Sequence, residues 1–119
     1  MRSSETHRAA PLDSWNEHEW TDGVQIDELR PLDHLRVRTR NSTYEIVVTA
    51  PYTGDVLVRG GARFPTYTRA RVSGSTVGGT VVKRAGVYPA FRLELEIEGC
   101  RILTSPVTAI DVNPPTGDH

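Results

Sequence analysis

Apolar and polar positions alternate in two clear stretches of the chain. In residues 35–40, Leu, Val and Thr alternate with three arginines, and in residues 91–98, Phe, Leu and Ile alternate with Arg and Glu. A repeat of two residues places successive side chains on opposite faces of a β-strand. Both stretches are therefore predicted to be strands with one apolar face and one charged face.

Weaker stretches of the same kind are separated by residues that favour turns. Gly supplies backbone conformations with positive φ, Pro fixes φ, and Asn and Ser bond to nearby backbone groups. The Gly78–Gly79 pair lies inside one predicted strand and indicates a bulge or a sharp bend there. Further strands are predicted at residues 23–26, 44–49, 56–58, 68–72, 77–83, 101–104 and 107–112, with turns at residues 41–42, 51–55, 60–61, 73–75, 98–99 and 105–106.

This series of short strands predicts an all-β fold, a small antiparallel barrel or sandwich of about seven strands. Val, Ile and Thr, which suit a pleated sheet, make up 31 of the 119 residues. The all-β domain is predicted over residues 24–112, after an acidic, flexible and mostly irregular extension (residues 1–23) and before a Pro-rich tail (residues 113–119). The predicted core consists of Leu35, Val37, Tyr44, Ile46, Val48, Val56, Val58, Val72, Val81, Phe91, Leu93, Leu95, Ile97, Ile102, Val107 and Ile110.

Three short motifs resemble those of small, uncharacterised all-β bacterial domains of no assigned function. They are the runs Arg38–Tyr44, Gly74–Thr76 and Thr104–Val107, and the resemblance extends over about residues 35–112. It implies the all-β fold and transfers no catalytic residue.

Length and composition exclude several classes of protein. A chain of 119 residues suits one domain, and no apolar stretch approaches the roughly 18 residues that span a bilayer. No contiguous apolar region typical of a secretory signal is visible near the N-terminus. The single cysteine excludes an intramolecular disulfide. We therefore expect a soluble, cytoplasmic protein with no membrane contact.

The net charge of −1 conceals a segregation of charge along the chain. Residues 1–33 have a net charge of −5, residues 34–84 of +7, and residues 85–119 of −3. Arginines with interleaved aromatic residues could bind nucleic acid or another polyanion, because guanidinium groups bind phosphates and aromatic rings stack on bases. The candidate anion-binding residues are Arg36, Arg38, Arg40, Arg59, Arg63, Arg69 and Arg71.

Internal charge pairing is the favoured alternative for this basic stretch. Glu94, Glu96 and Glu98 form an acidic row with the same two-residue spacing as the row at residues 36–40. If the two strands are neighbours, the rows pair across the sheet. Otherwise both rows are solvated faces.

The sequence predicts no catalytic residue, no metal site and no cofactor. Ser73–Thr80 is rich in Gly and hydroxyl residues but lacks the Lys and the following helix of a phosphate loop, so a hairpin is favoured. An Asp33–His34–Ser42 relay is disfavoured, because adjacent side chains on a strand point apart. Cys100 is expected to be a small buried residue.

The hypothesis favoured by these observations is a non-catalytic binding or assembly module that acts through protein–protein contacts. The partner is another protein or a second copy of the chain, since a small sheet has strand edges that are hard to hide. Trp15 and Trp20, in the acidic extension, are candidate residues for docking on a partner. The alternative is a small barrel that binds nucleic acid through its arginine-rich face.

Overall fold

The computed structural model describes residues 22–114, which contain nine strands, one short 3₁₀ turn and no α-helix. This confirms the all-β prediction. The strands are β1 (Val24–Gln25), β2 (His34–Thr39), β3 (Thr43–Ala50), β4 (Asp55–Gly60), β5 (Phe64–Val77), β6 (Thr80–Arg84), β7 (Gly86–Val87), β8 (Arg92–Ile97) and β9 (Cys100–Val112), with the 3₁₀ turn η1 at Ile26–Glu28.

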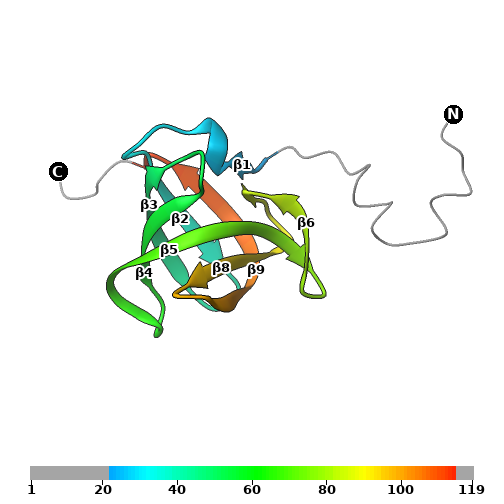
Figure 1. Ribbon diagram of the computed structural model, residues 1–119. Helices are drawn as coiled ribbons and strands as arrows, with labels where there is room; N and C mark the ends of the chain where they lie inside the picture. Colours follow the sequence, from blue (N-terminus) through cyan, green and yellow to red (C-terminus); the bar gives the residue numbers. More distant parts are fainter. Residues whose placement is uncertain (1–21, 115–119) are drawn as a thin grey trace, which may run out of the picture.

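Six of the strands form a ring in which each one pairs, antiparallel, with two neighbours. Going round, the order is β2, β3, β4, β5, β8 and β9, and the pairing of β9 with β2 closes the ring. The order along the chain is the order in space apart from β6 and β7, so consecutive strands need only short connections (Figure 1). Of the two predicted architectures, the structure is the barrel.

Strand β5 is longer than predicted because the expected turn at Ser73–Ser75 lies inside it. Gly74 has a φ of +145°, and the register with β8 shifts between Val72 and Gly74, which marks a bulge. A Cβ at Gly74 would lie 2.2 Å from the carbonyl oxygen of Lys83 on β6. The glycine is therefore needed for a close approach of two strands, and the turn is at Gly78–Gly79, where a bulge was predicted.

Strand β9 is also continuous through a predicted break, at Ser105–Pro106. Its first half pairs with β8 up to Pro106, and its second half, from Val107, pairs with β2. Pro106 lies where the strand changes neighbours, so the backbone N–H that proline lacks is not needed for a regular ladder. The Pro106 carbonyl oxygen accepts a hydrogen bond of 3.0 Å from the N–H of Arg40.

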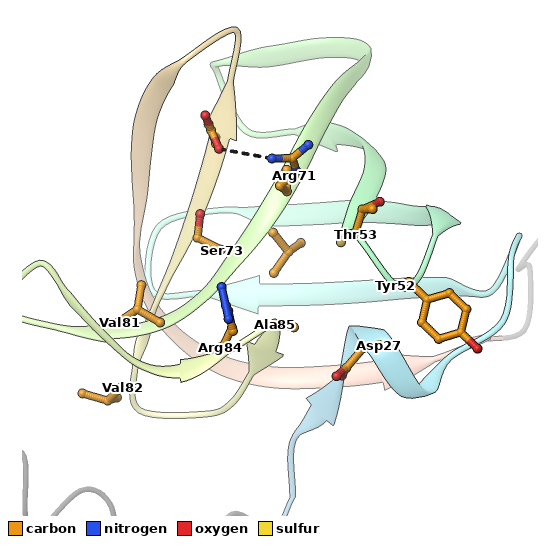
Figure 2. Close-up of a pocket in the computed structure, with 12 residues that line it drawn as sticks. Asp27, Tyr52, Thr53, Arg71, Ser73, Val81, Val82, Arg84 and Ala85 are labelled. Atoms are coloured by element: carbon orange, nitrogen blue, oxygen red, sulfur yellow. Dashed lines mark ion pairs between the residues drawn. The ribbon is translucent and has the colours of Figure 1, made fainter.

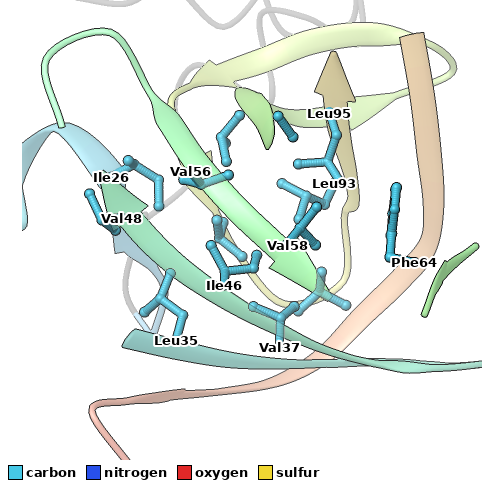
Figure 3. Close-up of a cluster of buried hydrophobic side chains, with 14 residues drawn as sticks. Ile26, Leu35, Val37, Ile46, Val48, Val56, Val58, Phe64, Leu93 and Leu95 are labelled. Carbon is cyan, nitrogen blue, oxygen red and sulfur yellow. The ribbon is translucent and has the colours of Figure 1, made fainter. Parts of the chain in front are cut away.

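The core fills the inside of the ring (Figure 3). Most of the predicted core residues are buried, including every second residue from Leu35 to Val37, Ile46 to Val48 and Leu93 to Leu95. Val81 is half-exposed instead, because β6 lies outside the ring. Five further residues are buried that the sequence did not identify as core residues: Ile26, Phe64, Ala70, Val87 and Tyr88.

Replacing a core residue should destabilise the fold far more than replacing the same residue type outside the barrel. Leu95 is 0% exposed and Leu103, on the adjacent strand, is 36% exposed. We expect Leu95→Ala to lower the free energy of unfolding by about 2–5 kcal/mol, and Leu103→Ala by less than about 1 kcal/mol. Urea denaturation of both variants measures this, and equal losses would contradict the assignment of the core.

Candidate binding surface

Two of the candidate arginines are held in ion pairs at the outer face of β2. Arg36 Nε lies 3.0 Å from Glu45 Oε2 on β3, and Arg38 lies 4.0 Å from Asp111 on β9. His34 Nε2 lies 2.5 Å from the second carboxylate oxygen of Glu45. These arginines are thus paired with the neighbouring strands of the sheet.

Arg71, on β5, is paired on both sides. Its guanidinium lies 3.5 Å from Asp55 on β4 and 3.9 Å from Glu96 on β8. Glu94, also on β8, lies 3.9 Å from Arg101 on β9. Charges of opposite sign therefore face one another across three neighbouring strand pairs.

The predicted pairing of the row Arg36–Arg40 with the row Glu94–Glu98 does not occur. Strand β9 lies between β2 and β8 in the ring, so the two rows are not on adjacent strands. Charge pairing is present, but acids at positions 45, 55 and 111 supply much of it.

The other four candidate arginines are exposed and make no ion pair within residues 22–114. Arg40 lies in the β2–β3 turn, while Arg59, Arg63 and Arg69 lie on the hairpin formed by β4 and β5. The Arg59 guanidinium carbon is 4.6 Å from the centre of the Tyr67 ring, within range of a cation–π contact. The β4–β5 hairpin thus carries one exposed tyrosine and three candidate arginines that make no ion pair within the described residues, in addition to the paired Arg71.

The same hairpin has an unpaired strand edge. On one side, β5 pairs with β4 from Phe64 to Arg71, whereas on the other side its pairing with β8 begins only at Arg71. No pairing within the described residues uses the second side of β5 before Arg71. Pro65 cannot donate a backbone hydrogen bond, so we define residues 66–70 as the open edge.

The backbone of Arg69 is directed towards the open edge. Val72 donates its N–H to the carbonyl oxygen of Gly54 at 2.9 Å, on the side of β4. Backbone groups of successive strand residues point to opposite edges. Ala70 and Thr68 therefore point towards β4, as Val72 does, and Arg69 points away from it.

A hollow of about 600 Å³ lies beside the open edge. One wall is β5, with Thr68, Arg69 and Ala70, and the other is the end of β8 with the following turn, including Ile97 and Glu98. The space required by another extended chain is thus present beside the unpaired backbone.

A larger hollow, of about 1030 Å³, lies elsewhere on β5 (Figure 2). It forms because β4 and β6 pair with the same edge of β5 and leave a gap at Val72 and Ser73. Its lining contains two arginines, Arg71 and Arg84, and two acids, Asp27 and Glu96. This mixed lining favours no single ligand charge.

The remaining sequence-based candidates that fall within residues 22–114 are not assembled into a site. Trp15 and Trp20 lie outside the described residues. His34 contacts Glu45 rather than Ser42, and Asp33 accepts the N–H of Arg30 at 2.9 Å. The expectation that Cys100 is buried is wrong, because the residue begins β9 at an exposed position next to the β8–β9 turn.

Within residues 22–114 no group of three or more His, Cys, Asp or Glu side chains is placed to hold a metal ion. None of the elements described there is a helix long and apolar enough to cross a membrane. The open edge itself could not be found from the sequence, because it depends on where β8 ends relative to β5.

The Glu45 carboxylate should stabilise the fold in a pH-dependent manner. Partial burial opposes the shift, but hydrogen bonds from Arg36 and His34 hold the pKa of Glu45 below its ordinary value of 4.5. A lowered pKa in the folded state contributes stability that is present above the ordinary pKa and is lost as the pH falls through the folded value. We expect Glu45→Gln to destabilise the protein at pH 6, and less so at pH 3.

Urea denaturation at the two pH values measures the difference. Glu98→Gln is the matched control, because Glu98 is exposed and makes no ion pair within the described residues. The same loss for Glu45→Gln at both pH values would contradict the role of the charge.

The backbone amide of Arg69 should exchange its hydrogen faster than those of its neighbours. Thr68 and Ala70 point towards β4, and Arg71 is in register with Glu96 on β8, so these three amides are within ladders. Residue-resolved hydrogen exchange by NMR measures the rates. Equal protection of Arg69 would show that the edge is covered.

Comparison of the chain with protein-family models, with curated proteins and with solved structures finds no match.

Proposed function

We propose that this protein is a non-catalytic binding module that acts through protein–protein contacts, and that the open edge of β5 is its contact site. A partner segment in extended conformation pairs with β5 as an added strand. The observation that carries the proposal is that residues 66–70 pair on one side only and lie beside a hollow of about 600 Å³ that Arg69 lines.

Strand addition suits this edge because its backbone is already in the required conformation. The β4 side of β5 is held by pairings from Asp55 to Gly60, so the edge needs no rearrangement before a partner binds. A bound strand forms main-chain hydrogen bonds with Arg69, and its side chains alternate between the hollow and the outer surface. Pro65 limits the contact to a short segment.

Binding of a nucleic acid is the second candidate function. It is supported by Arg59, Arg63 and Arg69, which make no ion pair within the described residues, and by Tyr67, which is 39% exposed. No Asp or Glu occurs in the sequence from Val56 to Ala70. Such binding weakens steeply with salt and does not require the backbone N–H of Arg69.

Loss of one backbone N–H should weaken strand addition. Arg69→Pro and Arg69→Ala both remove the guanidinium, but only proline removes the N–H directed to the open edge. Proline is tolerated at a strand edge whose N–H is not bonded within the fold. We expect octapeptides selected from a random library on the wild-type protein to bind Arg69→Ala and to bind Arg69→Pro at least tenfold more weakly.

Dissociation constants from biolayer interferometry measure this, with thermal denaturation to confirm that both variants fold. Equal binding by the two variants would overturn strand addition at this edge. Failure to select any peptide on the wild-type protein would overturn it as well.

A further inference from the structure

We infer that the segment that binds the open edge alternates acidic and aliphatic side chains. This inference rests on the proposed function and specifies the chemistry of the partner.

Strand β8 shows what this side of β5 accepts. Leu93 and Leu95 are buried in the core, while Glu96 extends outward and lies 3.9 Å from Arg71. β8 ends at Ile97 because the chain turns at Glu98–Gly99, yet β5 continues past this point to Phe64. A partner strand at the open edge therefore prolongs the line of β8.

Along the open edge, the residues of β5 have the same alternating orientation as they have beside β8. Arg69 is two residues from Arg71, so both side chains lie on the outer face and both residues point their backbone groups to the same edge. Ala70 is buried on the inner face, and Ile97 is half-buried at the end of β8. An outward acidic side chain on the partner can thus pair with Arg69, as Glu96 does with Arg71, while an inward aliphatic side chain meets Ala70 and Ile97.

The charge near the open edge favours the same partner. Arg59, Arg63 and Arg69 make no ion pair within residues 22–114, and the sequence from Val56 to Ala70 contains no acid. Asp55 and Glu96 also line the adjacent hollow, but both face Arg71. Glu98 is the remaining acid in that lining, which therefore contains three acids and two arginines, Arg69 and Arg71. When Arg59 and Arg63 on the hairpin are added, there are four arginines and three acids, so the net charge of the hairpin and the hollow together is +1.

A second copy of the hairpin is a poor occupant of the edge. Edge-to-edge pairing of two β5 strands would bring two sets of arginines together, and like charges on adjacent strands are destabilising. Pro65 would also lie in both paired strands and remove a donor from each. The partner is therefore a different segment of opposite charge.

A peptide with the sequence of β8 tests the inference. The probe is a fluorescein-labelled peptide of residues 93–98 with Ser-Gly at both ends, together with versions in which all three Glu are Gln or Lys. We expect the acidic peptide to bind the full chain about tenfold more tightly than the Gln peptide, since exposed ion pairs each contribute a few-fold in affinity. The Lys peptide should bind more weakly still.

Variants of the protein locate the contact. Fluorescence anisotropy should show that Arg59→Gln combined with Arg63→Gln weakens the acidic peptide about threefold or more, with little effect on the Gln peptide. Arg84→Gln is the matched control, because Arg84 is exposed and lies on β6, outside the hairpin formed by β4 and β5. Arg69→Pro should weaken the acidic peptide at least tenfold. If the peptide instead displaces β8, its binding would not depend on the Arg69 N–H, and unchanged binding to this variant would overturn the inference.

The other outcomes separate the inference from the proposed function. If the Gln peptide binds as tightly as the acidic one and both require the Arg69 N–H, strand addition holds and the acidic partner is wrong. If no peptide binds, both are overturned. If a single-stranded oligonucleotide binds at low salt and no peptide does, the hairpin is a nucleic-acid site and both are overturned in favour of the second candidate function.

Discussion

Closure of the sheet is the constraint on which the rest of the structure depends. In a ring of six antiparallel strands each strand has two neighbours and none is left at an end of the sheet, although parts of β5 and β9 pair on one side only. Closure here requires two strands, β5 and β9, that are long enough to change neighbours along their length. The bulge at Gly74 and the change of partner at Pro106 make these long strands possible.

The open edge follows from the same constraint. β5 must reach from β4 at one end of the barrel to β8 and β6 at the other, so it is longer than any one of its neighbours. Where β8 has already turned back at Glu98–Gly99, β5 is still paired with β4 and has nothing on its other side within the described residues. The binding surface is thus a consequence of unequal strand lengths in a closed sheet.

The outer face of the barrel is organised by charge. Arg36, Arg38 and Arg71 each face an acid on an adjacent strand, and the strands involved come from different parts of the sequence. Exposed pairs of this kind stabilise a protein only slightly. They also distinguish Arg71 from Arg59, Arg63 and Arg69 of the β4–β5 hairpin, which make no ion pair within residues 22–114.

The alternation of apolar and polar residues predicted much of this fold, because a strand that is buried on one face must have apolar residues at every second position. The segments around Leu35 and Leu95 have that pattern, and both are strands with the expected faces inward. Prediction failed at Ser73–Ser75 and Ser105–Pro106, where Gly and Pro serve a bulge and a change of neighbour rather than a turn. The candidate site was predicted only in part, since the sequence identifies seven arginines but does not show which of them have acidic neighbours.

The sequence by itself determined the class of fold, the faces of the strands and the identity of the charged groups, because these depend on side chains close together along the chain. Only the tertiary structure decided which strands are adjacent. That choice places β9 between β2 and β8, pairs Arg36 with Glu45, and ends β8 before β5. Adjacency in a closed sheet is set by packing and by long-range hydrogen bonding, to which a two-residue repeat is insensitive.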